Sequence, residues 1–383
     1  MTSPPELAWG QVAAWRLRRQ HLDPRTTRTA AQVASRLCGV QAQVRSAADL
    51  AVALRRSPAA PGAVDDGLAD LSLMKTWAMR GTLHLLPPHE AGAYLALMQT
   101  TGFWLRPSWQ RVSGVTPRQI DELTEAVASI LDGVVRTRDQ LVTELVADGR
   151  FAAIEGPLRS GWGQVLKPLA WRGVLCHGPD QDNAITFTRP ASRFPTWEPI
   201  PTADAAAPVV IAAYLGAYGP ATPEAFDRWL SLNATSRLRL RRWFADMGDQ
   251  LSEVDVDGRR AWMLAEHVEE LIATPPASGV RLLGGFDQYV LGPGTNDDAL
   301  LPAPHRAAVS RASGWISPVV VVDGRIAGVW EISDDELVVS HFPGSTRPPA
   351  DALDAEAMHV AEARGLSRLR VRQASYPVDA AAG

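Results

Sequence analysis

The chain has 383 residues, of which 46% are hydrophobic, with a mean hydropathy of −0.08 and a formal net charge of −4. The length predicts two or three domains or a series of repeated modules. No apolar run approaches the roughly 18–20 residues of a transmembrane helix, which excludes a membrane protein. The N-terminus has no signal-peptide pattern and two cysteines exclude a disulfide framework, so we expect a cytoplasmic protein.

Arginine supplies almost all of the basic charge. The only lysines are Lys75 and Lys167, so 36 of the 38 basic residues are arginine. A GC-rich genome is the simplest explanation, but arginine is also the better ligand for phosphates and base edges. Between residues 10 and 60, nine arginines accompany only two acidic residues. The acidic total argues against a nucleic-acid-binding protein, whereas this local excess predicts a basic patch.

The first unit is predicted to span residues 6–98. A helix over residues 7–20 is followed by two helices within residues 30–56, of which the second opens with a capping-box pattern at Ser46 and Asp49. Residues 71–86 end as an alternating strand. Three helices followed by a β segment is the order of a winged helix.

The same order recurs in units predicted over residues 116–190 and 205–275. The predicted helices are 117–131, 137–146 and 158–171 in the second unit, and 206–215, 224–230 and 235–247 in the third. A β segment over 173–188 and a hairpin over 251–264 follow them, the latter with an Asp-Gly turn. Residue identity between the copies is low, but the shared order indicates an internal architectural repeat.

Residues 280–375 are predicted to be β-rich. The strongest hairpin of the chain joins residues 315–322 to 325–332 through Asp323 and Gly324. This hairpin has two possible roles. Its tip, led by Arg325, enters a DNA groove, or the hairpin only completes a barrel. The predicted fold class is α+β, with three tandem winged helices before this region.

Gln41 and Gln43 lie in the short link between the two helices of residues 30–56. On an extended link, residues two apart point to the same side. Both amides would then face one spot, framed by the positive charges of Arg36 and Arg45. One interpretation is structural, in which the amides hold the turn between the helices. The other is chemical, in which a neutral pair of donors and acceptors serves a site.

Three further candidates each have a structural alternative. His84 shares a strand face with Thr82 and either contacts a phosphate or substrate, or belongs to a polar, half-exposed strand. Asp287 either stabilises a developing cation or orients a water, or it caps a turn. A row of arginines in the third helix of the third unit either binds phosphates or forms a solvated face. These arginines are Arg237, Arg239, Arg241 and Arg242.

Other chemistries lack support in the sequence. It contains no Cys/His cluster with zinc spacing, no glycine-rich phosphate loop and no G-x-S-x-G motif. We therefore expect neither a metal nor a cofactor.

Several segments together resemble one family. They are Val40–Gln43, Arg80–Leu85, Trp162–Gly178, Tyr214–Trp229, Phe286–Tyr289 and Gly314–Trp330. From about residue 7 to residue 371, the chain is similar to the winged-helix DNA-binding superfamily that includes the AlkZ-type DNA glycosylases. That family is linked to resistance against azinomycin-like crosslinking agents. The order and spread of the segments carry the resemblance, since each segment alone is weak.

The resemblance implies three tandem winged helices with β-rich C-terminal additions, in a C-shape around DNA. The family's catalytic signature is two glutamines separated by one residue, which falls on Gln41 and Gln43. The middle residue, Ala42, is smaller than the usual bulky apolar residue, and a sister branch has Asp at the second position. We expect DNA contacts from the arginines, which are Arg36, Arg45, Arg237, Arg239, Arg241, Arg242 and Arg325.

The implied chemistry suits a neutral pair of side chains. Alkylation at N7 of guanine or N3 of adenine makes the base cationic, so its departure needs no general acid. The protein must place a water beneath C1′ and tolerate an oxocarbenium-like transition state, and a glutamine carbonyl does both. We expect a metal-independent, monofunctional DNA glycosylase for cationic N-alkylpurines, with unhooking of interstrand crosslinks as an extension.

Two rival functions remain on the sequence alone. One rival is a non-catalytic winged-helix regulator. The other is a structural protein that sequesters damaged DNA. Excision of N7-methylguanine from DNA separates these alternatives from a glycosylase. The expected partner is double-stranded DNA carrying alkylated purines, with no membrane involved, and the protein is expected to act as a monomer.

Overall fold

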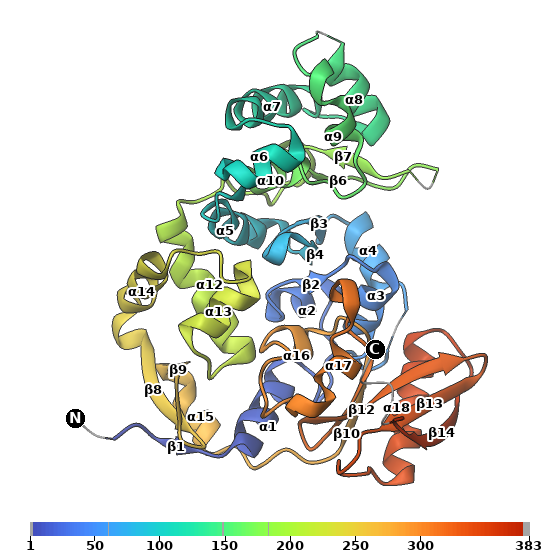
Figure 1. The fold of residues 1–383 in the computed structure, drawn as a ribbon. Coiled ribbons are helices and arrows are strands. Elements are labelled where there is room, and N and C mark those ends of the chain that lie inside the picture. Colours follow the sequence, from blue (N-terminus) through green and yellow to red (C-terminus); the bar gives the residue numbers. More distant parts are fainter. Residues whose placement is uncertain (1–2, 60, 148, 183, 378–383) are drawn as a thin grey trace.

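The computed structural model describes residues 3–377 except residues 60, 148 and 183. In this part of the chain, helices are mixed with four β-sheets, three of three strands and one of five. The predicted class, α+β, is therefore confirmed. In Figure 1, the elements from α6 to α10 form a lobe at the top of the view, above the rest of the chain. No helix in the described ranges has the length and hydropathy needed to cross a membrane.

The first small sheet carries the link with the two glutamines. Its strands are β2 (Val40–Gln41), β3 (Met74–Trp77) and β4 (Leu83–Leu86), and β4 lies in the middle. The accompanying helices are α2 (Ala30–Arg36), α3 (Arg45–Ala53) and α4 (Ala63–Ala69). The link between α2 and α3 is thus partly a strand, as its extended conformation requires.

The start of α3 differs from the prediction. The helix begins at Arg45 and no side chain caps it, so the predicted capping box at Ser46 and Asp49 is wrong. Asp49 instead accepts a hydrogen bond from Arg45 Nε at 3.0 Å, because residues four apart lie on one helix face. A capping box is found on α2, where Thr29 and Gln32 exchange bonds of 3.3 and 3.1 Å.

The second small sheet has the same strand order. Its strands are β5 (Val135–Thr137), β6 (Cys176–His177) and β7 (Thr186–Thr188), with β7 in the middle. Its helices are α7 (Pro117–Ile130), α8 (Arg138–Val146), α9 (Glu155–Arg159) and α10 (Leu166–Trp171). The single helix predicted over 158–171 is therefore wrong, since α9 ends before α10 begins. Gly163, between them, has a φ of +61°, which interrupts the helix.

The third small sheet includes a strand from the start of the chain. The hairpin of β8 (Leu251–Val256) and β9 (Arg259–Leu264) is extended by β1 (Glu6–Leu7), which runs parallel to β8. On the other side, Ala221 forms an isolated bridge with Trp262 of β9. The accompanying helices are α12 (Ala203–Tyr218), α13 (Pro223–Ser231) and α14 (Arg237–Asp246).

Helix α1 (Trp9–Arg19) is shorter than predicted because Leu7 pairs with Val256 in a strand. Val12 of α1 packs in one cluster with Val254 of β8. The helix also contacts α12 and α15 (Val268–Ile272). The first residues of the predicted first unit therefore lie against the third group of elements.

The C-terminal region forms a five-stranded sheet with its strands in numerical order. They are β10 (Val280–Leu283), β11 (Val319–Val322), β12 (Arg325–Ser333), β13 (Glu336–His341) and β14 (Arg370–Ser375). The predicted hairpin is confirmed, although its first arm begins four residues later than expected. Helix α18 (Ala350–Ala363) joins β13 to the parallel β14. The remaining α-helices described are α5 (Pro88–Gln99), α6 (Pro107–Ser113), α11 (Pro190–Arg193), α16 (Gln288–Leu291) and α17 (Arg306–Val309).

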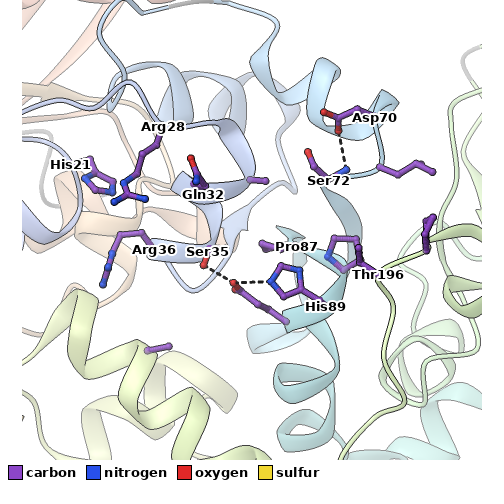
Figure 2. A pocket seen from close by; sticks show the side chains of 16 residues that line it. His21, Arg28, Gln32, Ser35, Arg36, Asp70, Ser72, Pro87, His89 and Thr196 are labelled. Atoms are coloured by element: carbon purple, nitrogen blue, oxygen red, sulfur yellow. Dashed lines mark hydrogen bonds and ion pairs between the residues drawn. The ribbon is translucent and has the colours of Figure 1, made fainter.

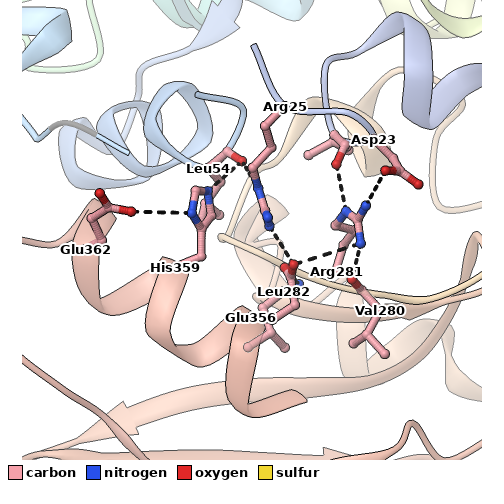
Figure 3. A network of polar contacts seen from close by, with 10 residues as sticks. Asp23, Arg25, Leu54, Val280, Arg281, Leu282, Glu356, His359 and Glu362 are labelled. Carbon is pink, nitrogen blue, oxygen red and sulfur yellow. Dashed lines mark hydrogen bonds and ion pairs between the residues drawn. The ribbon is translucent and has the colours of Figure 1, made fainter. Parts of the chain in front are cut away.

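A polar network fastens α18 to the end of α3 (Figure 3). The buried carboxylate of Glu356 accepts hydrogen bonds from Arg25 Nη2 at 2.5 Å and from Leu282 N at 3.1 Å. Arg25 Nε donates to Leu54 O at 3.1 Å, and His359 Nε2 lies 3.2 Å from the same oxygen. Because Leu54 directly follows α3, the network ties the C-terminal region to the helix after the glutamine pair.

We expect Gly163→Ala to destabilise the fold by roughly 2–4 kcal/mol. A Cβ at residue 163 would lie 2.4 Å from Cζ2 of Trp77, and the positive φ would become strained. Gly156→Ala is the matched control, because a Cβ there meets nothing within 4 Å. Thermal unfolding measures both variants, and equal melting temperatures would contradict the packing of Trp77 on Gly163.

Candidate active site

Gln41 ends β2 and Gln43 follows it by two residues, and β2 pairs with β4 near the middle of Figure 1. Gln41 on β2 is the register partner of His84, and Ala42 N donates to Leu83 O at 2.7 Å. Leu83 N in turn lies 3.4 Å from Gln43 Oε1, within reach of a weak hydrogen bond. Gln41 is only 7% exposed, whereas Gln43 is exposed. The extended link expected from the sequence is present, and it offers Gln43 to solvent.

Arg80 fixes the amide of Gln41 and was not a predicted site residue. Its Nη2 donates to Gln41 Oε1 at 3.0 Å, and its Nη1 donates to Trp229 O of α13 at 2.7 Å. Burial lowers the pKa of Arg80 to about 10, so the guanidinium remains charged at neutral pH. The carbonyl of Gln41 is therefore already engaged, and Gln43 holds the more available acceptor of the pair.

His84 lies beside Gln41 on the neighbouring strand β4 and is out of contact with solvent. The side chain is 0% exposed, and its Nδ1 lies 3.0 Å from Thr82 O. Burial first, and the charge of Arg80 second, lower the pKa of His84 to about 3, so the imidazole is neutral at physiological pH. The structure matches neither alternative: the strand position is fully buried and not half-exposed, and a buried neutral ring has no access to a DNA backbone.

Asp287 forms a buried ion pair and does not face the glutamines. Both its side chain and that of Arg55 are 0% exposed. Arg55 Nη1 and Nη2 donate to the two carboxylate oxygens at 2.8 and 2.7 Å, and Asp287 Oδ1 also accepts from Tyr289 N at 2.8 Å. With both oxygens engaged, Asp287 is a cap and an ion-pair partner, which corrects its assignment to the pocket.

The expected cationic frame around the glutamines is also wrong. Arg45 is paired with Asp49 and with Asp65 of α4. Arg36 lies next to α12, where its Nη1 is 3.8 Å from the position of a Cβ built on Gly216. The positive charge in contact with the pair comes from Arg80 instead, which sequence spacing did not connect to it.

Residues 16–56 do not form one basic face. Arg16 and Arg55 are buried, and Arg18 lies 3.6 Å from Glu270. The predicted basic patch over this segment is therefore wrong as a continuous surface, because packing inside the chain uses much of its charge.

The arginines of α14 lie away from the glutamine pair. Arg237 and Arg241 are exposed, whereas Arg242 pairs with Asp204 of α12. Figure 1 shows α12 and α13 between α14 and β2. Arg239 lies on the same helix. All four arginines therefore stay predicted DNA contacts, for a part of the duplex away from the glutamine pair.

The turn before Arg325 is covered by α1 and does not project from the protein. A Cβ on Gly324 would lie 2.3 Å from Ala13 Cβ, and Tyr289 Oη donates to Gly324 O at 2.8 Å. Asp323 N bonds to Gly279 O at 2.9 Å. The tip is therefore anchored to the rest of the chain, which favours the structural alternative, whereas the Arg325 side chain is exposed and its contact with DNA stays a prediction.

An exposed aromatic residue beside α3 was missed. Trp315 is 45% exposed, and its ring meets Phe286 edge-on with centroids 5.1 Å apart at 78°. The adjacent Ile316 O would lie 2.9 Å from a Cβ on Gly285. Gly284 in turn packs against Leu50 of α3, again at 2.9 Å from a built Cβ. The segment with Trp315 thus lies beside the helix that follows Gln43.

Comparison with known proteins gives consistent matches over almost the whole chain. A family model described as DNA glycosylase AlkZ-like matches residues 34–363. The interstrand DNA cross-link repair glycosylase of Streptomyces sahachiroi is 67% identical over 366 residues, which are 95% of this chain and 99% of that protein. The structure of Streptomyces sahachiroi DNA glycosylase AlkZ matches with a TM-score of 0.95 and 66% identity, covering 96% of this chain and 100% of that one.

We expect Asp287→Asn to destabilise the protein by about 3–5 kcal/mol, because it leaves the buried Arg55 charge without its carboxylate. Asp65→Asn is the control: it removes the more exposed pair with Arg45 and should change stability by about 1 kcal/mol or less. Urea unfolding compares the two variants. Similar midpoints would mean that the buried pair contributes no more than a surface pair.

Proposed function

Because the chain belongs to the AlkZ-like family of DNA glycosylases, we propose that it is a monofunctional glycosylase for cationic N-alkylpurines such as N7-alkylguanine. A relative is named as an interstrand DNA cross-link repair glycosylase, and we extend that activity, the unhooking of crosslinks, to this chain. The observation that carries the proposal is the pair Gln41 and Gln43, of which the second is exposed just before α3.

The proposed architecture is three tandem winged helices in a C-shape around DNA. In two small sheets the last strand lies between the first two, and the bridge at Ala221 gives the third sheet the same order. The units are residues 6–98, 116–190 and 205–275, followed by the β-rich region 280–375. The packing of α1 against α12 joins the two ends of this series.

The proposed reaction needs little from the protein beyond a placed water. An alkylated purine is cationic and leaves without a general acid, so the barrier lies in forming an oxocarbenium-like sugar. In this mechanism, Gln43 Oε1 accepts a hydrogen bond from the attacking water, and its dipole faces the developing cation. The water oxygen bonds to C1′ as the C1′–N9 bond breaks, the base leaves as a neutral molecule, and the proton released by the water passes to solvent. Gln41, with its carbonyl held by Arg80, presents its amide nitrogen and positions the substrate.

The proposed partner is double-stranded DNA with alkylated purines, bound by a monomer in the cytoplasm. Exposed arginines of α14 and Arg325 are proposed to contact the backbone. Such contacts release counterions, so affinity should fall as salt rises.

A direct test incubates the protein with a duplex that contains one N7-methylguanine. Excision leaves an abasic site, which alkali converts to a strand break. A duplex with unmodified guanine at the same position is the control and should stay intact. If no alkylated duplex yields breaks, the protein is a non-catalytic DNA-binding member of its family.

Replacing Gln43 by Ala should lower the excision rate by roughly 100-fold or less, at the lower end of general-base effects, because the leaving group is already activated. Gln41→Ala should also slow excision. Single-turnover kinetics on N7-methylguanine DNA measure both. Gln43→Asp is the sharper comparison: it supplies a stronger base and a negative charge, so it should retain measurable excision. Parental rates in both alanine variants would leave the pair with only a structural role.

We also propose that Trp315 stacks on DNA next to the lesion. Stacking of an aromatic side chain on a base contributes about 1–3 kcal/mol, so Trp315→Ala should weaken binding of an alkylated duplex about 10-fold. Trp162→Ala is the matched control, because Trp162 is 82% exposed but lies in the upper lobe between α9 and α10. Fluorescence anisotropy measures both affinities, and equal losses would contradict a specific role for Trp315.

A further inference from the structure

A cavity of about 670 Å³ lies where α2, the start of α5, α12 and the segment around Pro195 meet (Figure 2). Among the described residues that line it, neither glutamine of the candidate active site is present. The volume falls within the range of roughly 300–1,000 Å³ that is typical of small-molecule sites. The cavity is therefore large enough for a ligand and separate from Gln41 and Gln43.

Two arginines give one end of this cavity its positive charge. Arg28 precedes α2 and Arg36 ends it, and Figure 2 shows both on the same side of the cavity as His21. Within the described part of the chain, Arg28 forms hydrogen bonds through its backbone N–H, which donates to Thr26 Oγ1, and its C=O, which accepts from Arg56 Nε. Within the described residues, no carboxylate oxygen lies within 4.0 Å of either guanidinium. Both side chains are thus available to an anion.

The third cationic candidate at this end, His21, is neutral. Burial first, and then the nearby charges of Arg36 and Arg28, lower the pKa of His21 to about 4. At neutral pH the positive charge therefore comes from the two arginines, and the imidazole offers a neutral hydrogen-bonding group.

The carboxylates that line the cavity are already engaged. Glu90 Oε1 accepts from Ser35 Oγ at 2.6 Å and lies 3.6 Å from His89 Nε2. Asp70 Oδ1 accepts from Ser72 N at 2.9 Å. An anion at the arginine end would therefore not have to displace an ion pair, which removes a main cost of binding it.

We propose that this cavity binds a phosphate ester of nucleotide size, with its phosphate at Arg28 and Arg36. Arginine presents planar N–H forks that match phosphate oxygens. The amide nitrogen of Gln32, whose oxygen accepts from Thr29 N, and the hydroxyl of Thr196 also line the cavity and suit a sugar or base. The phosphate comes either from a free mononucleotide or from a DNA strand, which share this chemistry. The site does not depend on the proposed glycosylase activity.

Isothermal titration of the full chain with 2′-deoxyguanosine 5′-monophosphate tests the site. Arg28→Gln combined with Arg36→Gln should weaken binding at least 10-fold. Arg364→Gln combined with Arg368→Gln is the matched control: it removes the same charge from exposed positions after α18, and binding should not change. Equal affinity of the parental protein and the cavity variant, or no binding to the parental protein, overturns the proposal.

A second titration, in the presence of undamaged duplex DNA, identifies the source of the phosphate. If the duplex competes with the nucleotide, and the cavity variant also binds the duplex more weakly, the site holds a phosphate of a DNA strand. If the duplex does not change nucleotide binding, the site holds a free nucleotide. Melting temperatures report folding, and if the double variant does not fold, Arg28→Gln alone carries the test, because that side chain is exposed. Titration measures nucleotide binding and does not require base excision. A negative glycosylase assay would therefore not change the outcome of this test.

Discussion

The buried ion pair between Arg55 and Asp287 holds the helix behind the glutamine pair in place. Removing two charges from water costs several kcal/mol for each, and only good geometry with further hydrogen bonds offsets that cost. Here the two side chains meet through two bonds of 2.7 and 2.8 Å, and Arg55 Nη1 also donates to Ala51 O at 2.8 Å. Such a pair is stable only when the two side chains keep this geometry. Since Arg55 follows α3 closely, the position of Gln43 at the other end of α3 depends on the C-terminal region.

The same physics explains how an acidic chain can contact an anionic partner. Net charge counts every arginine, but an arginine that is paired inside the fold contributes little field outside it. Arg25, Arg45 and Arg55 are neutralised by Glu356, Asp49 and Asp287. Arg28 and Arg36 are not, since no carboxylate oxygen of the described residues lies within 4.0 Å of either guanidinium. The distribution of unpaired guanidiniums is therefore a better guide to binding surfaces than the total of −4.

Local rules allowed much of the fold to be predicted. The order of helices and hairpins, the Asp-Gly turn at residue 323 and the extended link at Gln41 all depend on neighbours within a few residues. The contacts that define the site do not. Gln41 meets Arg80 across 39 positions and Arg55 meets Asp287 across 232. Spacing cannot reveal which arginine is buried against which acceptor. The continuous basic patch was therefore predicted wrongly. Of the two roles considered for Asp287, the cap is confirmed, but its ion pair with Arg55 was missed.

The way Arg80 holds Gln41 bears on selectivity in the proposed reaction. The carbonyl of Gln41 is bound to a guanidinium and the neighbouring His84 is neutral and buried, so the exposed acceptor of this pair is the amide carbonyl of Gln43. An amide is a very weak base, so it can orient a water but cannot drive attack on a stable glycosidic bond. The driving force then has to come from the substrate, through the positive charge of an alkylated base. A normal nucleoside lacks that charge and would survive in the same site. Because Arg80 engages the carbonyl of Gln41, the site remains a weak catalyst. A weak catalyst would thus distinguish alkylated from normal bases without tight recognition of the base.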